Sequence, residues 1–180
     1  MKLLITTIAL LLVPLPVFSQ DLSTTDLREL FYQAAASKQA AQRLYDKLLT
    51  IDESSQPLLL GYKGMACFMI CHHALNPYSK IKYFLQGRSY LDQALKRDPG
   101  NLELRFLRFT VQTNAPEFLG YTRNILADKT FILNSLENDA DKTIAQELRI
   151  KIVEYLLQTK YCTPPERSRV ESYLTGEEDS

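Results

Sequence analysis

The sequence has no tryptophan, two histidines, three cysteines and only six glycines among its 180 residues. A glycine-rich phosphate-binding loop, a serine nucleophile elbow and a His-Glu-x-x-His zinc motif are all absent from it. Carboxylates are numerous, but they are scattered along the chain rather than paired in an apolar setting. We therefore expect that the protein is not an enzyme and has neither catalytic residues nor a cofactor.

An excess of charge of one sign is also missing, because 21 basic residues balance 21 acidic ones. Proteins that bind nucleic acid or anionic lipid surfaces usually concentrate lysine and arginine on one face. The balanced composition indicates no such field, so nucleic acid is not an expected partner. Residues 176–180 are rich in acidic side chains and are expected to be a polar tail.

The first 19 residues are predicted to be a signal peptide. One lysine precedes an apolar stretch over residues 3–18, and the small residue Ser19 stands before Gln20, where a signal peptidase would cut. The stretch is shorter than a typical membrane span and contains two prolines. An uncleaved membrane anchor is the alternative. We expect an exported bacterial protein, periplasmic or secreted, with no stable membrane insertion after cleavage.

The sequence lacks the apolar–polar alternation of strands, and helical spacing takes its place. One predicted face carries apolar residues at i, i+3, i+4 and i+7: Leu27, Leu30, Phe31 and Ala34. The sequence predicts an all-α fold of about seven to nine helices, paired as antiparallel hairpins in one domain over residues 20–175. The expected helices start near residues 24, 38, 57, 79, 102 and 116, with a short one at Asp128, one capped by residues 138–141 and a last one carrying Val170.

The segment from Gly87 to Asn101 shows a repeat-like pattern. Gly87, Leu91, Ala94 and Pro99 follow the small, bulky, alanine and proline spacing of the second helix of a tetratricopeptide repeat. Residues 24–114 therefore resemble tetratricopeptide repeats, and the whole chain is similar to short exported helical proteins of bacteria. This resemblance implies a short array of stacked helical hairpins. It also implies that a protein or peptide partner lies against the first helix of the hairpins.

The helix expected after Asn101 departs from the repeat pattern. Its repeat positions for an aromatic residue, Leu-Gly and Tyr are occupied instead by Arg105, Arg108, Phe109 and Gln112. Arg105, Arg108 and Gln112 make a polar stripe, and Phe106 and Phe109 flank it. Because a guanidinium group binds carboxylates through two hydrogen bonds, these five residues are candidates to bind an acidic peptide. The alternative is a solvated face, or arginines paired with nearby carboxylates.

The helix expected from Pro57 to about residue 74 is apolar nearly all round, so it is predicted to lie in the middle of the bundle. Cys67 and Cys71 are one turn apart on it, and His72 follows directly. This order resembles the Cys-x-x-Cys-His haem-attachment run with one residue added, so a haem or metal site is an alternative function. The other reading is a pair of buried structural cysteines. Cys162 either pairs with one of them or stays free.

Overall fold

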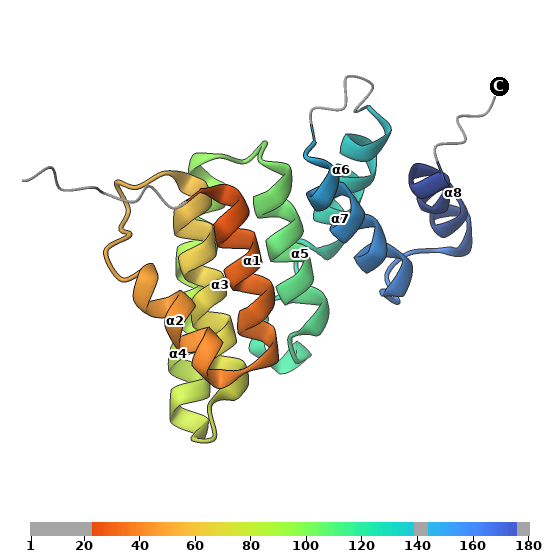
Figure 1. The fold of residues 1–180 in the computed structure, drawn as a ribbon. Helices are drawn as coiled ribbons and strands as arrows, with labels where there is room; N and C mark the ends of the chain where they lie inside the picture. The colour runs from red at the N-terminus through yellow and green to blue at the C-terminus, as the bar shows by residue number, and fades with distance from the viewer. Residues whose placement is uncertain (1–22, 139–143, 176–180) are drawn as a thin grey trace, which may run out of the picture.

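The structure, a computed structural model, describes residues 23–138 and 144–175. Within these ranges there are eight α-helices, one 3-10 helix and no strand (Figure 1), so the predicted all-α fold is confirmed. The predicted signal peptide with its Ser19–Gln20 cleavage site and the acidic tail lie outside the described residues. The helices are α1 (Thr24–Ala36), α2 (Lys38–Lys47), α3 (Pro57–His73), α4 (Pro77–Arg97), α5 (Leu102–Asn114), α6 (Ile125–Glu137), α7 (Gln146–Gln158) and α8 (Pro164–Thr175), with the 3-10 helix η1 (Glu117–Leu119) between α5 and α6.

Short polar side chains fix where several helices begin. The Ser23 hydroxyl accepts from the backbone N–H of Asp26 at the start of α1, and Asn101 does the same for Leu104 in α5. Such caps satisfy backbone donors that have no partner inside the helix. Asn76 caps α4, so that this helix starts at Pro77, two residues before the expected position.

Consecutive helices pack in pairs, α1 with α2, α3 with α4, α5 with α6 and α7 with α8 (Figure 1). α3 also contacts α1, α2 and α5, which places it in the middle of the first three pairs, as its apolar sequence predicted. Every residue from Leu60 to Phe68 is buried. A helix that is apolar nearly all round needs neighbours around it, and α3 has α1, α2, α4 and α5.

The α3–α4 pair depends on two glycines that face each other. A Cβ atom added at Gly64 would lie 2.8 Å from the carbonyl oxygen of Gly87, and one added at Gly87 would lie 2.8 Å from the carbonyl oxygen of Gly64. Contacts this short do not occur for real Cβ atoms, so the two backbones approach as closely as glycine allows. The small residue of the predicted repeat pattern therefore has a direct packing role.

α5 joins two hydrophobic clusters. Leu104 and Leu107 pack into a cluster made by α1 to α4, whereas Phe106 and Phe109 pack into a second cluster made by α6, α7 and α8. Two different faces of one helix therefore serve the two clusters. The position of α5 decides how the last three helices sit on the first four.

The segment after α5 differs from the sequence prediction. Pro116 precedes only the short η1, which ends at Gly120 with φ 62°, and no α-helix begins there. α6 begins at Ile125, so Asp128 lies in its first turn instead of capping a separate helix. The physical reason is that two arginines of α5 hold the Asp128 carboxylate inside the protein. Asn138 ends α6, and the rest of the cap expected at residues 138–141 lies outside the described residues.

Candidate functional site

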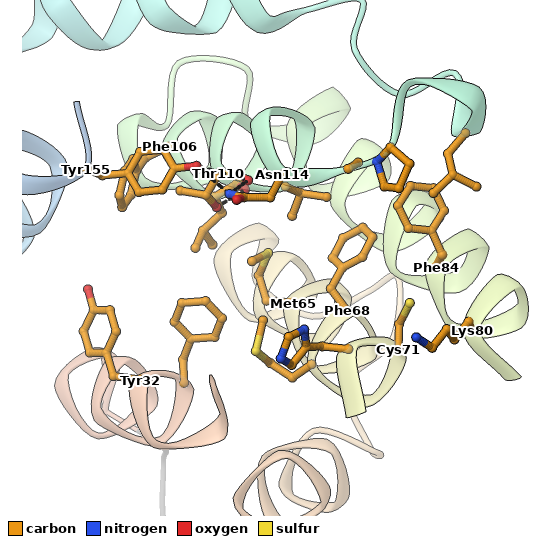
Figure 2. A pocket seen from close by; sticks show the side chains of 18 of the residues that line it. Tyr32, Met65, Phe68, Cys71, Lys80, Phe84, Phe106, Thr110, Asn114 and Tyr155 are labelled. Carbon is orange, nitrogen blue, oxygen red and sulfur yellow. Dashed lines mark hydrogen bonds between the residues drawn. The ribbon is translucent and has the colours of Figure 1, made fainter. Parts of the chain in front are cut away.

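A groove of about 830 Å³ lies between α1, α3, α4, α5, η1 and α7 (Figure 2). The first helix of each of the four pairs contributes to it. Small-molecule and peptide pockets commonly have volumes in the range of about 300 to 1,000 Å³ with mostly apolar linings. The floor and walls are formed mainly by Phe31, Met65, Phe68, Phe106, Leu107 and Val111.

Two ridges of side chains form the long sides of the groove. They come from α3 and α5, and in each ridge the residues follow the helical spacing i, i+4, i+7. The ridges are Met65, Met69 and His72 on α3, and Leu107, Val111 and Asn114 on α5. Of these six residues the sequence singled out only His72, as a haem or metal ligand, because an apolar residue at helical spacing is usually part of a core.

The two ends of the groove differ in charge. At the α7 end, Lys151 pairs with Glu154 at 2.9 Å and also lies 5.6 Å from the centre of the Tyr32 ring. At the α4 end, the Lys80 side chain is exposed and makes no hydrogen bond or ion pair within the described ranges. The groove therefore carries a neutralised pair at one end and a free cation at the other.

The polar groups on the α5 side of the groove are bonded to one another. The Tyr155 hydroxyl lies 2.5 Å from the Thr113 hydroxyl, and it accepts a hydrogen bond of 2.6 Å from the Asn114 amide. Thr110 donates its hydroxyl proton to the carbonyl oxygen of Leu107. Burial raises the pKa of the Tyr155 phenol, which therefore remains protonated at neutral pH. These groups hold α5 and α7 together and leave few bonds for an occupant.

The α4 end has an apolar rim. Ile81 is 54% exposed and Phe118, on η1, is 84% exposed, although both line the groove. Tyr78 and Leu85 on the same part of α4 are exposed as well. Clustered apolar side chains beside a groove commonly mark a surface that binds another molecule.

The structure places the predicted arginine stripe against α6. Arg108 donates to both oxygens of Asp128 at 2.7 Å, and Arg105 donates to one of them at 3.0 Å. Asp128 is fully buried. Phe109 and Gln112 are also buried, and the Gln112 amide has no hydrogen-bond partner among the described residues. Of the five predicted residues only Phe106 lines the groove, and the arginines use their donors within the protein.

A second buried carboxylate ties α1 and α3 to α5. Arg28 donates to both oxygens of Glu103 at 2.8 and 2.7 Å, and the Tyr62 hydroxyl donates to Glu103 at 2.5 Å. Burial and the charge of Glu103 raise the pKa of Tyr62, so the phenol keeps its proton as a donor. The network connects the helices that carry the two ridges. It is structural and lies outside the groove lining.

Cys67, Cys71 and Cys162 are all free thiols. Cys67 is fully buried, and burial raises the pKa of its thiol to about 12, which keeps it protonated. Cys71 and His72 line the groove, whereas Cys67 does not. Cys162 packs in the cluster formed by α6, α7 and α8. Within residues 23–138 and 144–175, no three His, Cys, Asp or Glu side chains gather so that they could hold a metal ion.

Comparisons with protein-family models, with curated proteins and with solved structures find no match for this chain. In the part of the chain that the structure describes, no helix combines the length and apolar character needed to cross a membrane. The groove has therefore to be interpreted from its own residues and their chemistry.

Proposed function

We propose that this protein is an exported helical-repeat module that holds a protein or peptide partner in the groove and catalyses no reaction. The observation that carries the proposal is the groove itself, about 830 Å³ in volume and lined by the first helix of each helix pair. Stacked helical hairpins commonly use such a surface for binding. The resemblance of residues 24–114 to tetratricopeptide repeats supports the same kind of function.

The exposed rim also supports a macromolecular partner. Ile81 and Phe118 remain largely in water although they border an apolar surface. A partner that covers the groove would remove them from water as well, with a gain of about 25 cal/mol for each Å² of apolar surface. The polar lining residues Thr110, Asn114 and Tyr155 are engaged in mutual hydrogen bonds, which suits a scaffold better than a reactive site.

Export is the second element of the proposal, and it depends on residues 1–19 as a signal peptide. Cell fractionation followed by N-terminal sequencing of the native protein tests it. A mature protein that starts at Gln20 in the periplasm or the medium supports export. A cytoplasmic protein that still carries residues 1–19 refutes it.

Site-specific photo-cross-linking in the native cell tests the binding function. A photoreactive phenylalanine analogue replaces Tyr32 or Phe118, which border opposite ends of the groove. Thr130 on α6 is the matched control, because it is exposed and does not line the groove. We expect one protein partner from both groove positions and none from the control. Identical products at all three positions would contradict binding in the groove.

A further inference from the structure

Resting on the function proposed above, we infer that the groove holds an amphipathic α-helix of a partner protein. The apolar stripe of that helix lies against α3 and α5, and an acidic end lies beside Lys80. Three features of the groove support a helical occupant. They are the polar groups on its α5 side that already hydrogen-bond to one another, the spacing of its two ridges and the unequal charge of its ends.

The hydrogen bonds on the α5 side of the groove favour a peptide segment that makes its own backbone hydrogen bonds. An extended peptide carries free N–H and C=O groups, and each buried one needs a partner. On its α5 side the groove offers Thr110, Asn114 and Tyr155, and the donors of these three side chains are already directed to acceptors on Leu107, Thr110 and Tyr155. Tyr32, His72 and Gln158 also line the groove, but so few side-chain groups cannot pair every N–H and C=O of an extended backbone. A helix makes its backbone hydrogen bonds internally, so it loses nothing when its apolar side enters this groove.

The described residues also offer no strand edge. Extended peptides usually bind by adding a strand to an exposed sheet edge, where the backbone of the host supplies the hydrogen bonds. Between residues 23 and 138, and again from 144 to 175, the chain contains no strand. Among the other known modes, a helix whose anchors follow the spacing i, i+3 or i+4, and i+7 is the one that matches the spacing of the two ridges.

The two ridges match such a helix in shape. From Met65 to His72 on α3, and from Leu107 to Asn114 on α5, each ridge covers seven residue steps. Seven steps of a helix are about 10 Å, or two turns. Side-chain ridges at i±4 spacing form the channels into which the ridge of another helix packs. Met65 and Met69 add flexible thioethers, which adapt to different apolar side chains.

The volume agrees with this length. A helix with its side chains is about 10 to 12 Å across and rises 5.4 Å per turn, so half of one turn fills about 250 Å³. The groove of about 830 Å³ therefore accepts the apolar half of about three turns. The third turn lies beyond the ridges, over the exposed rim formed by Ile81 and Phe118.

The charges at the ends give the helix a direction. Lys151 and Glu154 neutralise each other at the α7 end, whereas Lys80 has no counter-ion among the described residues. A helix C-terminus carries a partial negative charge, and an acidic side chain in its last turn adds to it. The acidic, C-terminal end of the partner helix therefore lies beside Lys80.

The test uses purified protein and a fluorescent synthetic peptide of about 16 residues, long enough to form a helix on binding. Its leucines are spaced i, i+4, i+7 and i+11, and one glutamate stands in the last turn. Fluorescence anisotropy measures the dissociation constant, and circular dichroism measures the gain in helix. One control peptide has the same composition with the leucines scrambled, and a second has a central proline that breaks the helix.

Two protein variants locate the peptide. Val111→Glu places a charge on the floor, and we expect binding to weaken at least about tenfold, a loss of about 1.4 kcal/mol. Lys80→Glu, which is exposed and leaves the core untouched, should weaken binding about threefold and be rescued by a peptide that ends in lysine. Lys82→Glu is the matched control on α4, because Lys82 is exposed and does not line the groove. Thermal melts establish that each variant is folded.

Selective binding of the helical peptide supports a helical occupant, provided that Val111→Glu weakens this binding and that the peptide ending in lysine restores binding to Lys80→Glu. Equal binding of the proline peptide, still lost in Val111→Glu, overturns the helix but leaves the proposed binding function standing. Binding of a long-chain fatty acid in the groove, with no binding of any peptide, overturns the helical occupant. No peptide binding, combined with no partner in the cross-linking experiment, overturns both the helix and the proposed function.

Discussion

Asp128→Asn is the substitution that best separates a structural from a partner-binding role for Arg105 and Arg108. The Asp128 carboxylate is fully buried and accepts three hydrogen bonds from the two guanidinium groups. The Arg105 and Arg108 side chains are 21% and 13% exposed. An asparagine at this position keeps the shape but removes the negative charge, and it turns an N–H₂ group toward at least one arginine.

The expected loss in the free energy of unfolding depends on which contacts each arginine keeps. Loss of one partner of a buried ion pair destabilises a protein by about 3 to 5 kcal/mol, because the other charge stays buried without compensation. Arg105 keeps its hydrogen bond to the carbonyl oxygen of Pro99 and its position over the Phe131 ring. We therefore expect the lower end, about 3 kcal/mol, which lowers Tm by about 6 to 12 °C for a chain of this size.

Urea and thermal unfolding, followed by circular dichroism, measure this loss. Asp46→Asn is the matched control, because Asp46 is exposed and, among the described residues, its carboxylate accepts a hydrogen bond only from Gln42. It should change stability by less than about 0.5 kcal/mol. Arg108→Met combined with Asp128→Asn should cost less than the two single changes added together, since the pair is removed as a unit.

The opposite result has a clear meaning. If Asp128→Asn costs less than about 1 kcal/mol and shows no coupling with Arg108→Met, the carboxylate does not hold the arginines. Arg105 and Arg108 would then be free to bind an acidic partner, as their spacing in the sequence suggested. An unchanged affinity for the partner in the folded Arg108→Met variant would assign them to the structure of α5 and α6.

Three further predictions concern packing, thiol chemistry and pH. Gly64→Ala should destabilise the fold by at least about 2 kcal/mol in urea unfolding, because its Cβ would meet an α4 carbonyl, whereas Gly100→Ala, with open space around it, should be neutral or stabilising. Alkylation and mass spectrometry should show that Cys71, half-exposed in the groove, reacts in the native state and that Cys67 reacts only on unfolding; equal rates would contradict the burial of Cys67. Burial tends to raise the pKa of Glu166, but hydrogen bonds from a lysine of α6 and from the start of α8 hold that pKa below its ordinary value of 4.5. The stability that the Glu166 carboxylate contributes is complete above pH 4.5 and disappears as the pH falls through the lower pKa of the folded state. The difference in stability between the protein and Glu166→Gln, measured by urea unfolding, should therefore shrink on acidification.

The helices could be predicted because their signals are local. The spacing of Leu27 and Ala34 and the capping residues Ser23 and Asn101 act within one or two turns, and the structure has α1 and α5 where these signals put them. The central position of α3 could also be predicted, since a segment without a polar face has to be covered on every side.

The partner of the arginine stripe could not be predicted in the same way. Helical spacing shows that Arg105 and Arg108 share a face, but it does not show what lies opposite that face. Asp128 is about 20 residues further along the chain, and the turn at Gly120 is what brings it back to α5. In the sequence, Asp128 has the features of a helix cap. Its burial between two guanidinium groups depends on tertiary packing, which local sequence signals do not reveal.

The groove was hidden in the sequence for a related reason, and the structure shows what creates it. Met65 and Val111 have the spacing of core residues, and they line a groove because none of the described helices occupies the space beside them between α1, α3 and α5. α7 reaches α5 through the edge contacts of the Tyr155 ring with Phe106 and Phe109, and it meets α1 through Lys151 and Tyr32. α7 therefore closes one end of the space between α1, α3 and α5 instead of filling it. A helix supplied by another protein would complete the packing that α7 leaves open, which is why the residues of the site resemble a core.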